Sequence, residues 1–152
     1  MKRALITGIT GQDGAYLAQF LLKKGYSVYG SYRRQSSGNF WRLHYLDIAE
    51  KINFLPADVL DSTSLYRSLE ISDPAEIYHL AVQSFVGASF DQPLYTSDVT
   101  GFGTVRILDE IFKFFKKIKF YQASSSEMFG SEKSFVQNES TNSRFHGVLQ
   151  PI

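Results

Sequence analysis

The 152-residue sequence contains no cysteine. This absence excludes disulfide bonds, thiolate metal ligands and a cysteine nucleophile. Long apolar runs are lacking as well. The apolar stretch at the N-terminus ends at Gly8 and is too short for a signal peptide or a membrane span. Charge of one sign is not in excess, since the formal net charge is +1. We therefore expect a cytoplasmic protein that binds neither nucleic acid nor membranes and has no metal site.

Glycines are present, and three of them stand close together near the start of the chain with the spacing G-x-x-G-x-x-G. They follow a β-favouring run, residues 3–7, and precede a segment with helical spacing, residues 16–22. A strand, a glycine turn and a helix in this order bind phosphate, because unpaired N–H groups and the helix dipole attract an anion. Glycine also lets a pyrophosphate approach the backbone closely. We therefore predict a nucleotide site at Gly8, Ile9, Thr10, Gly11, Gln12, Asp13 and Gly14.

Strand-like and helical segments alternate along the rest of the chain. Apolar runs predict strands at residues 3–7, 27–30, 52–55, 76–81 and 118–123. Helical spacing predicts helices over residues 13–24, 64–69 and 94–115, while residues 35–51 are polar and aromatic and indicate a functional loop or short helix. This order predicts an α/β fold, a Rossmann-like, doubly wound parallel sheet that is incomplete at its C-terminal side. We expect residues 1–141 to form a partial NADP-binding Rossmann domain and residues 142–152 an irregular tail, without a substrate domain.

The end of the second predicted strand indicates which cofactor the turn would hold. NAD sites usually place Asp or Glu about 20 residues past the glycines, where it binds the ribose 2′-hydroxyl. Here the sequence has Arg33 and Arg34 and no carboxylate. Two guanidinium groups can bind a 2′-phosphate through charge-assisted, bidentate hydrogen bonds, so NADP is predicted over NAD. The alternative is that the two arginines belong to a solvated loop.

The next two strands also end in polar residues. Asp58 follows the third strand at the edge where α/β sheets bind ligands, and its partner there would be the adenine amino group. The alternative for this segment is that Asp61 or Ser62 caps the helix that follows, and both interpretations can be true. His79 lies inside the apolar run of the fourth strand, which is more typical of a core histidine than of a catalytic one. Beyond it, small and polar residues would let a ribose or nicotinamide approach closely: Ala81, Gln83 and Ser84.

A run of three serines and a glutamate follows the fifth predicted strand, at residues 124–127. Hydroxyls and a carboxylate at the ligand edge of the sheet are suited to moving protons on a substrate. The same Ser-x-x-Glu spacing also suits the cap of a helix, and spacing alone does not decide between the two.

Several separate blocks resemble one known group of enzymes. The fingerprint at residues 7–14 is similar to that of the extended short-chain dehydrogenase/reductases that act on nucleotide sugars. More closely, the chain resembles the GDP-mannose 4,6-dehydratase family through residues 11–17, 33–37, 81–90 and, most specifically, 120–130. The resemblance extends from residue 3 to about residue 141.

This resemblance implies a reaction and the residues that carry it. Family members convert GDP-mannose to GDP-4-keto-6-deoxymannose: hydride passes from C4 to bound NADP, water leaves from C5–C6, and the hydride returns at C6. Ser125 would polarise the C4 oxygen, and Glu127 would be the acid/base of the elimination. The family also suggests a homo-oligomer. Cofactor contacts carried over by motif are Gly8 to Asp13, Arg33, Asp58, Val59, Leu80, Ala81, Val82, Gln83, Ser84 and Tyr95.

The sequence departs from the family after residue 141. Family members continue with Pro-x-Ser-Pro-Tyr-x-x-x-Lys, in which the tyrosine takes the C4 hydroxyl proton and the lysine lowers its pKa. No Tyr-x-x-x-Lys follows Glu127 here, so we expect a truncated or frameshifted dehydratase. One alternative is an NADP-binding module without catalysis. The other is a different nucleotide-sugar epimerase or dehydratase, although an epimerase has no elimination for the Ser125–Glu127 pair to assist.

Overall fold

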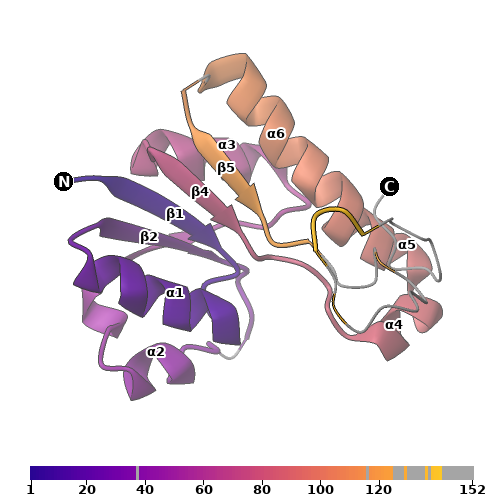
Figure 1. Ribbon diagram of the computed structural model, residues 1–152, viewed down its shortest axis with the longest axis horizontal. Coiled ribbons are helices and arrows are strands. Elements are labelled where there is room, and N and C mark those ends of the chain that lie inside the picture. The colour runs from indigo at the N-terminus through magenta and orange to yellow at the C-terminus, as the bar shows by residue number, and fades with distance from the viewer. Residues whose placement is uncertain (37, 116, 125–128, 130–135, 137, 142–152) are drawn as a thin grey trace.

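The computed structural model describes residues 1–36, 38–115, 117–124, 129, 136 and 138–141. In this part of the chain five strands form one parallel sheet in the order β3-β2-β1-β4-β5. The chain moves outward from β1 to β3 and then returns to the other side of β1 with β4 and β5 (Figure 1). This confirms the predicted doubly wound α/β fold. The strands are β1 (Arg3–Thr7), β2 (Ser27–Tyr32), β3 (Ile52–Pro56), β4 (Glu76–His79) and β5 (Lys119–Gln122).

Helices cover both faces of the sheet (Figure 1). α1 (Gln12–Lys23) and α2 (Trp41–Tyr45) lie on one face, and α3 (Ser62–Ser72) and α6 (Gly103–Phe114) lie on the other. Because successive side chains of a strand point to opposite faces, β1 contributes to two separate cores. Ala4 and Ile6 belong to the core under α1, whereas Leu5 belongs to the core under α3 and α6. The three central residues of this innermost strand are therefore apolar on both faces, as expected for a parallel sheet that is covered on both sides.

The helical segments differ in detail from their predictions. The segment predicted as one helix over residues 94–115 begins as α5 (Pro93–Ser97), passes through a π-helical turn (Asp98–Phe102) and ends as α6. Backbone angles stay right-handed helical at both joints, so the path is continuous and only its hydrogen-bond pattern changes. α4 (Val86–Asp91) was not predicted. The predicted loop or short helix at residues 35–51 contains α2 and a 3₁₀ turn, Ala49–Lys51.

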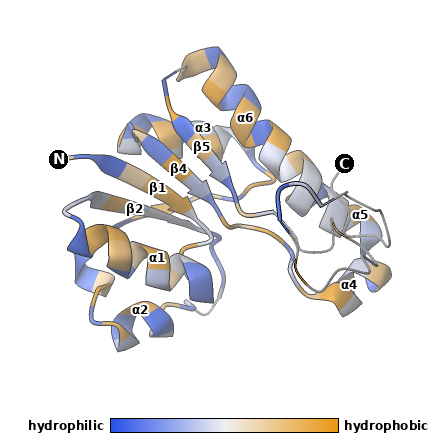
Figure 2. Ribbon diagram, viewed as in Figure 1, coloured by the Kyte–Doolittle hydropathy of each residue, from blue (hydrophilic) through white to orange (hydrophobic). Residues whose placement is uncertain are grey.

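The apolar stripe of α6 is wider than the surface it buries. Ile107 and Ile111 face the sheet and are 2% and 9% exposed. Val105, Leu108 and Phe112 are hydrophobic as well but exposed, and Figure 2 shows hydrophobic and hydrophilic stretches along α6. Among the described helices, none combines the length and hydropathy needed to cross a membrane.

Candidate functional site

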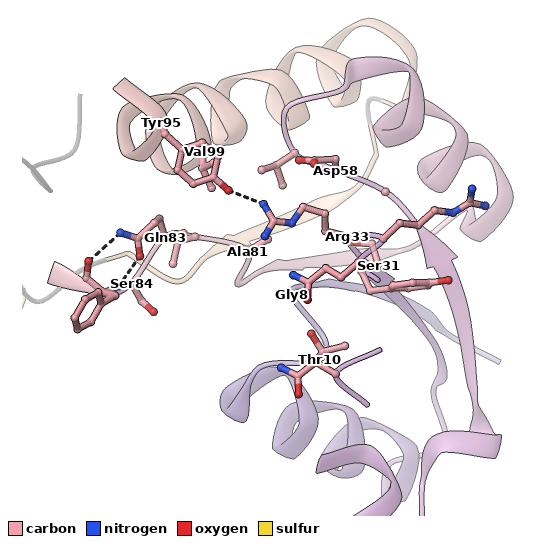
Figure 3. Close-up of a pocket in the computed structure, with 18 of the residues that line it drawn as sticks. Gly8, Thr10, Ser31, Arg33, Asp58, Ala81, Gln83, Ser84, Tyr95 and Val99 are labelled. Atoms are coloured by element: carbon pink, nitrogen blue, oxygen red, sulfur yellow. Dashed lines mark hydrogen bonds between the residues drawn. The ribbon is translucent and has the colours of Figure 1, made fainter. Parts of the chain in front are cut away.

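A cleft of about 740 Å³ opens at the C-terminal ends of the strands. Its walls come from the segments that follow β1, β2, β3 and β4, and Figure 3 shows the labelled side chains surrounding a common space. The strand order reverses between β1 and β4, and this reversal is where open α/β sheets bind their ligands. Predicted binding residues that line the cleft are Gly8, Thr10, Arg33, Arg34, Asp58, Val59, Ala81, Val82, Gln83, Ser84 and Tyr95.

The glycine turn packs its backbone directly against neighbouring backbone. Gly8 has a φ of 71°, and a Cβ there would lie 2.9 Å from the Leu80 carbonyl oxygen. A Cβ on Gly14 would lie 2.6 Å from the Gly8 carbonyl oxygen. Gly11 precedes α1 without any side-chain cap, so side chains do not occupy the N–H groups of the first helical turn. The turn thus keeps the positive end of α1 accessible to an anion.

Some predicted contacts of the turn do not line the cleft. The Ile9 side chain is fully buried in the core under α1, so only its backbone belongs to the turn. Leu80 is likewise half-buried against that core. The other predicted binding residues that do not form part of the cleft wall are Gly11, Gln12, Asp13 and Gly14.

Arg33 reaches across the cleft from the end of β2. Its Nη1 donates a hydrogen bond to the hydroxyl of Tyr95 on α5, at 2.6 Å (Figure 3). Arg34 lines the same cleft, and both arginine side chains are exposed. Arg33 and Arg34 therefore both contribute to one cleft wall, and no Asp or Glu occurs between Ser31 and Phe40.

Two aspartates after β3 have different positions and partners. Asp61 caps α3, since its side chain accepts from the backbone N–H groups of Thr63 (3.0 Å) and Ser64 (3.2 Å). Asp58 lines the cleft, and its Oδ1 accepts from the Leu60 N–H at 3.0 Å. Helix capping is thus the role of Asp61, whereas Asp58 lies in the cleft wall.

His79 is a fully buried histidine in the core of the sheet, as its sequence context indicated. Its Nδ1 lies 2.6 Å from the Thr7 hydroxyl, which also accepts from the N–H groups of Leu80 (3.2 Å) and Ala81 (3.3 Å). Because that hydroxyl already accepts two hydrogen bonds, its own proton points to Nδ1, which places the imidazole proton on Nε2. Burial lowers the pKa of His79 to about 4, so the ring is neutral near pH 7. Thr7, which was not among the predicted site residues, thereby holds the start of the loop after β4 against β1.

The loop after β4 is held in place by its own side chains. The Gln83 amide donates to the Phe85 carbonyl at 2.8 Å and accepts from the Phe85 N–H at 2.6 Å (Figure 3). The Gln83 N–H donates to the Thr100 hydroxyl at 3.3 Å, which ties the loop to the π-helical turn. The polar atoms of the Gln83 side chain therefore bind within the loop. Gln83 lines the cleft together with Ala81 and Ser84.

The two predicted catalytic residues, Ser125 and Glu127, lie outside the described residues. β5 ends at Gln122, which is in register with His79, and the Ala123 N–H donates to the His79 carbonyl at 3.1 Å. The chain therefore leaves the sheet at the edge that carries the cleft. The sequence did not predict eleven further residues that line the cleft: Ser31, Tyr32, Gln35, Gly38, Asn39, Phe40, Ala57, Phe85, Ala88, Gln92 and Val99. Four of them, Gln35 and Gly38 to Phe40, lie in the segment 35–51 that was expected to be a functional loop or short helix.

Comparison with known proteins identifies relatives over most of the chain. A family model described as GDP-mannose 4,6 dehydratase matches residues 5–146. The GDP-mannose 4,6 dehydratase of Cricetulus griseus is 47% identical over 148 residues, covering 92% of this chain and 40% of that protein. The GDP-mannose 4,6-dehydratase of Vibrio cholerae is 47% identical over 150 residues, covering 92% and 39%. The chain thus spans about two fifths of the length of these relatives.

Solved structures share the fold at low sequence identity. A UDP-glucose 4-epimerase from Stenotrophomonas maltophila, solved with NAD and formylated UDP-arabinopyranose, has a TM-score of 0.85 at 18% identity and covers 98% of this chain. That match spans 44% of the epimerase. A dTDP-glucose 4,6-dehydratase from Bacillus anthracis in complex with NAD has a TM-score of 0.80 at 21% identity, covering 98% of this chain and 46% of its own. At such identities the likeness establishes the Rossmann-like fold alone.

Proposed function

The chain belongs to the GDP-mannose 4,6-dehydratase family, and we propose that it is the N-terminal, NADP-binding part of such an enzyme. The whole enzyme converts GDP-mannose to GDP-4-keto-6-deoxymannose and loses water. When bound, NADP would supply the hydride acceptor and donor that an internal hydride transfer needs. The observation that carries the proposal is the cleft at the strand ends, where a glycine turn and two arginines line the same space.

The residues of the cleft fit a dinucleotide. The pyrophosphate would lie at the uncapped N-terminus of α1, where the glycine turn lets it approach the backbone. One oxygen of Asp58 is occupied by the Leu60 N–H, which leaves the other to accept from the adenine amino group. Ala81, which lies beside Gly8, and Ser84, further along the cleft wall, would border the ribose and nicotinamide. Each part of the cofactor therefore has a partner of suitable chemistry.

NADP rather than NAD is the cofactor that the β2 end favours. Arg33 and Arg34 provide positive charge where an NAD site would hold a carboxylate. Tyr95 holds the Arg33 guanidinium inside the cleft through the 2.6 Å hydrogen bond. A guanidinium whose position is already fixed loses less conformational entropy when it binds a phosphate.

Ser125 and Glu127 are proposed as the catalytic residues of this part. In this proposal Ser125 donates a hydrogen bond to the C4 oxygen of the sugar, and Glu127 removes the C5 proton and protonates the leaving hydroxyl. β5, which precedes them, ends at the cleft edge of the sheet beside His79. A cytoplasmic homo-oligomer that takes GDP-mannose as substrate remains part of the proposal.

A second candidate is an NADP-binding module that does not catalyse the reaction. The observation in its favour is that no tyrosine occurs in residues 128–152, so these residues lack the Tyr-x-x-x-Lys that family members use at C4. Both candidates have the same cofactor site, and they differ in whether the 152-residue chain catalyses the dehydration of GDP-mannose.

The two candidates are separated by measuring binding and turnover on the same sample. NADPH and NADH are titrated into the 152-residue chain and followed by nicotinamide fluorescence, and we expect NADPH to bind at least tenfold more tightly. Incubation with NADP and GDP-mannose is expected to give no 4-keto-6-deoxy sugar. Equal affinities would refute the NADP assignment. Formation of the keto sugar would refute the non-catalytic candidate.

A further inference from the structure

Arg42, at the start of α2, forms an unusual connection to the glycine turn. Its Nη1 donates a hydrogen bond to the Thr10 carbonyl oxygen at 3.3 Å. Its guanidinium also lies over the Trp41 ring, 4.4 Å from the ring centroid, so the group is held from two sides. Arg42 is not part of the cleft wall, whereas Thr10 is.

α2 itself is firmly placed, so Arg42 has a fixed base. Leu43 is fully buried in the core that also contains Ile9. Phe40, directly before α2, packs edge-to-face against Tyr32 and Phe54, with ring centroids 5.1 and 5.0 Å apart. The end of the loop is therefore anchored by apolar packing, and its polar attachment to the turn is the Arg42 hydrogen bond.

The hydrogen bond joins two walls of the cleft. One wall comes from residues 33–35 and 38–40, which follow β2 and include Arg33 and Arg34; the other is the glycine turn at Thr10. In the described part of the chain no carboxylate lies within ion-pair distance of Arg42. Its charge and donors are thus not used to neutralise an acid, and its described polar contact is the Thr10 carbonyl.

We propose that Arg42 is a positioning residue for cofactor selectivity, and this inference rests on the NADP-binding function proposed above. By fixing the loop against the turn, Arg42 sets how far Arg33 and Arg34 stand from the ribose end of the cleft. A 2′-phosphate uses those arginines, so it gains from their fixed position. The 2′-hydroxyl of NADH makes little use of these arginines, so the affinity for NADH should depend little on Arg42.

The test compares NADPH and NADH affinities of the 152-residue chain and its Arg42→Met variant. Methionine keeps an apolar stem over Trp41 but has no donor for Thr10. Loss of one charge-assisted hydrogen bond is expected to weaken NADPH about tenfold, while NADH changes by less than about twofold. Arg42→Lys, which keeps one donor and the charge, is expected to restore most of the NADPH affinity. Arg67→Met, an exposed arginine on the remote helix α3, is the matched control and should change neither.

Each outcome decides the proposal. If Arg42→Met weakens both cofactors equally and lowers the melting temperature, Arg42 has only a structural role and the inference is wrong. Unchanged NADPH affinity in a folded variant overturns it as well. A wild-type chain that does not prefer NADPH refutes the proposed cofactor itself, and the inference falls with it. A wild-type preference that survives in Arg42→Met refutes only the role of Arg42.

Discussion

The cleft has two kinds of wall, one made by backbone and one made by exposed side chains. The backbone wall lines the cleft through Gly8, Thr10 and Ala81, and it rests on the remainder of the Gly8–Gly14 turn, on Thr7 and on Leu80. Its spacings leave no room for a Cβ at Gly8 or Gly14, and Thr7 is 1% exposed. The side-chain wall consists of Arg33, Arg34 and Tyr95, and its described internal bond is the one between Arg33 and Tyr95.

The two walls determine different properties of the site. The backbone wall allows a dinucleotide to approach the N-terminus of α1. Its N–H groups and close backbone contacts do not depend on side-chain rotamers. The side-chain wall would select between cofactors, since its guanidinium groups distinguish a phosphate from a hydroxyl. Substitutions in the first should therefore damage folding and binding together, whereas substitutions in the second should change selectivity and leave stability nearly intact.

The largest effect is expected for Gly14→Ala in the backbone wall. The new Cβ would lie 2.6 Å from the Gly8 carbonyl oxygen and 2.8 Å from the Ile9 Cα, and both contacts are with backbone that cannot rotate away. We expect a loss of more than about 3 kcal/mol in the free energy of unfolding, measured by urea titration. Binding of either cofactor should be lost in parallel.

Gly87→Ala provides the matched control for that substitution. Gly87 is also helical and lies in α4, but the atoms nearest to a Cβ there belong to the exposed ring of Phe85 and not to backbone. Its expected change is within about 0.5 kcal/mol. Similar stability losses for the two variants would show that the close packing of the turn is not what makes Gly14 necessary.

The backbone wall was largely predictable from sequence because its determinants are local. The G-x-x-G-x-x-G spacing between a strand and a helix identifies the turn, and the apolar runs gave all five strands to within about two residues. His79 was expected in the core, and it is fully buried. These features follow from patterns of period and residue type within a few positions of each other.

The side-chain wall was predictable only in part because it depends on tertiary contacts. Arg33 and Arg34 stand out by charge, but nothing local indicates that Arg33 meets Tyr95, 62 residues away. The hydrogen bond from Arg42 to Thr10 spans 32 residues and has no sequence signature. The division of the predicted helix into α5, a π-helical turn and α6 was likewise missed, because the apolar stripe of these segments has helical spacing throughout.

The second largest effect is the pH dependence of the unfolding free energy that we expect from His79, which lies behind the backbone wall. Burial lowers the pKa of His79 from 6.5 to about 4. Between these pH values His79 binds a proton in the unfolded chain but not in the folded chain. The free energy of unfolding therefore falls as the pH drops from 6.5 to 4. The full difference amounts to about 3 kcal/mol, and below pH 4 this group removes no more.

His79→Asn is the control for the pH dependence. Asparagine does not titrate, and its Oδ1 can still accept from the Thr7 hydroxyl. The variant should lose most of the slope of unfolding free energy against pH between 6.5 and 4, while the contribution of Glu76, whose pKa is lowered by its hydrogen bond to Lys2, persists. An unchanged slope would show that His79 is not the group responsible.

A smaller loss is expected for Thr7→Val, which keeps the shape but removes the hydroxyl. The Ala81 N–H loses its acceptor and His79 Nδ1 loses its donor, while the Leu80 N–H keeps its hydrogen bond to the Thr7 carbonyl oxygen. Leaving such buried groups unsatisfied costs about 2 kcal/mol in unfolding free energy. Thr7→Ser should recover most of it, and equal denaturation midpoints for Val and Ser would contradict the role assigned to the hydroxyl.

The smallest effect should come from Tyr95→Phe in the side-chain wall, and it separates the two walls most cleanly. Phenylalanine keeps the ring on α5 and removes only the hydroxyl that accepts from Arg33 at 2.6 Å. Because the bond is exposed, its loss should leave the melting temperature within about 1 °C. NADPH affinity should fall about fivefold, since the guanidinium must then be ordered by the phosphate itself, whereas NADH affinity should not change. A melting temperature that drops as far as that of Thr7→Val would mean that the Arg33–Tyr95 bond supports the fold, and the distinction between the two walls would then fail.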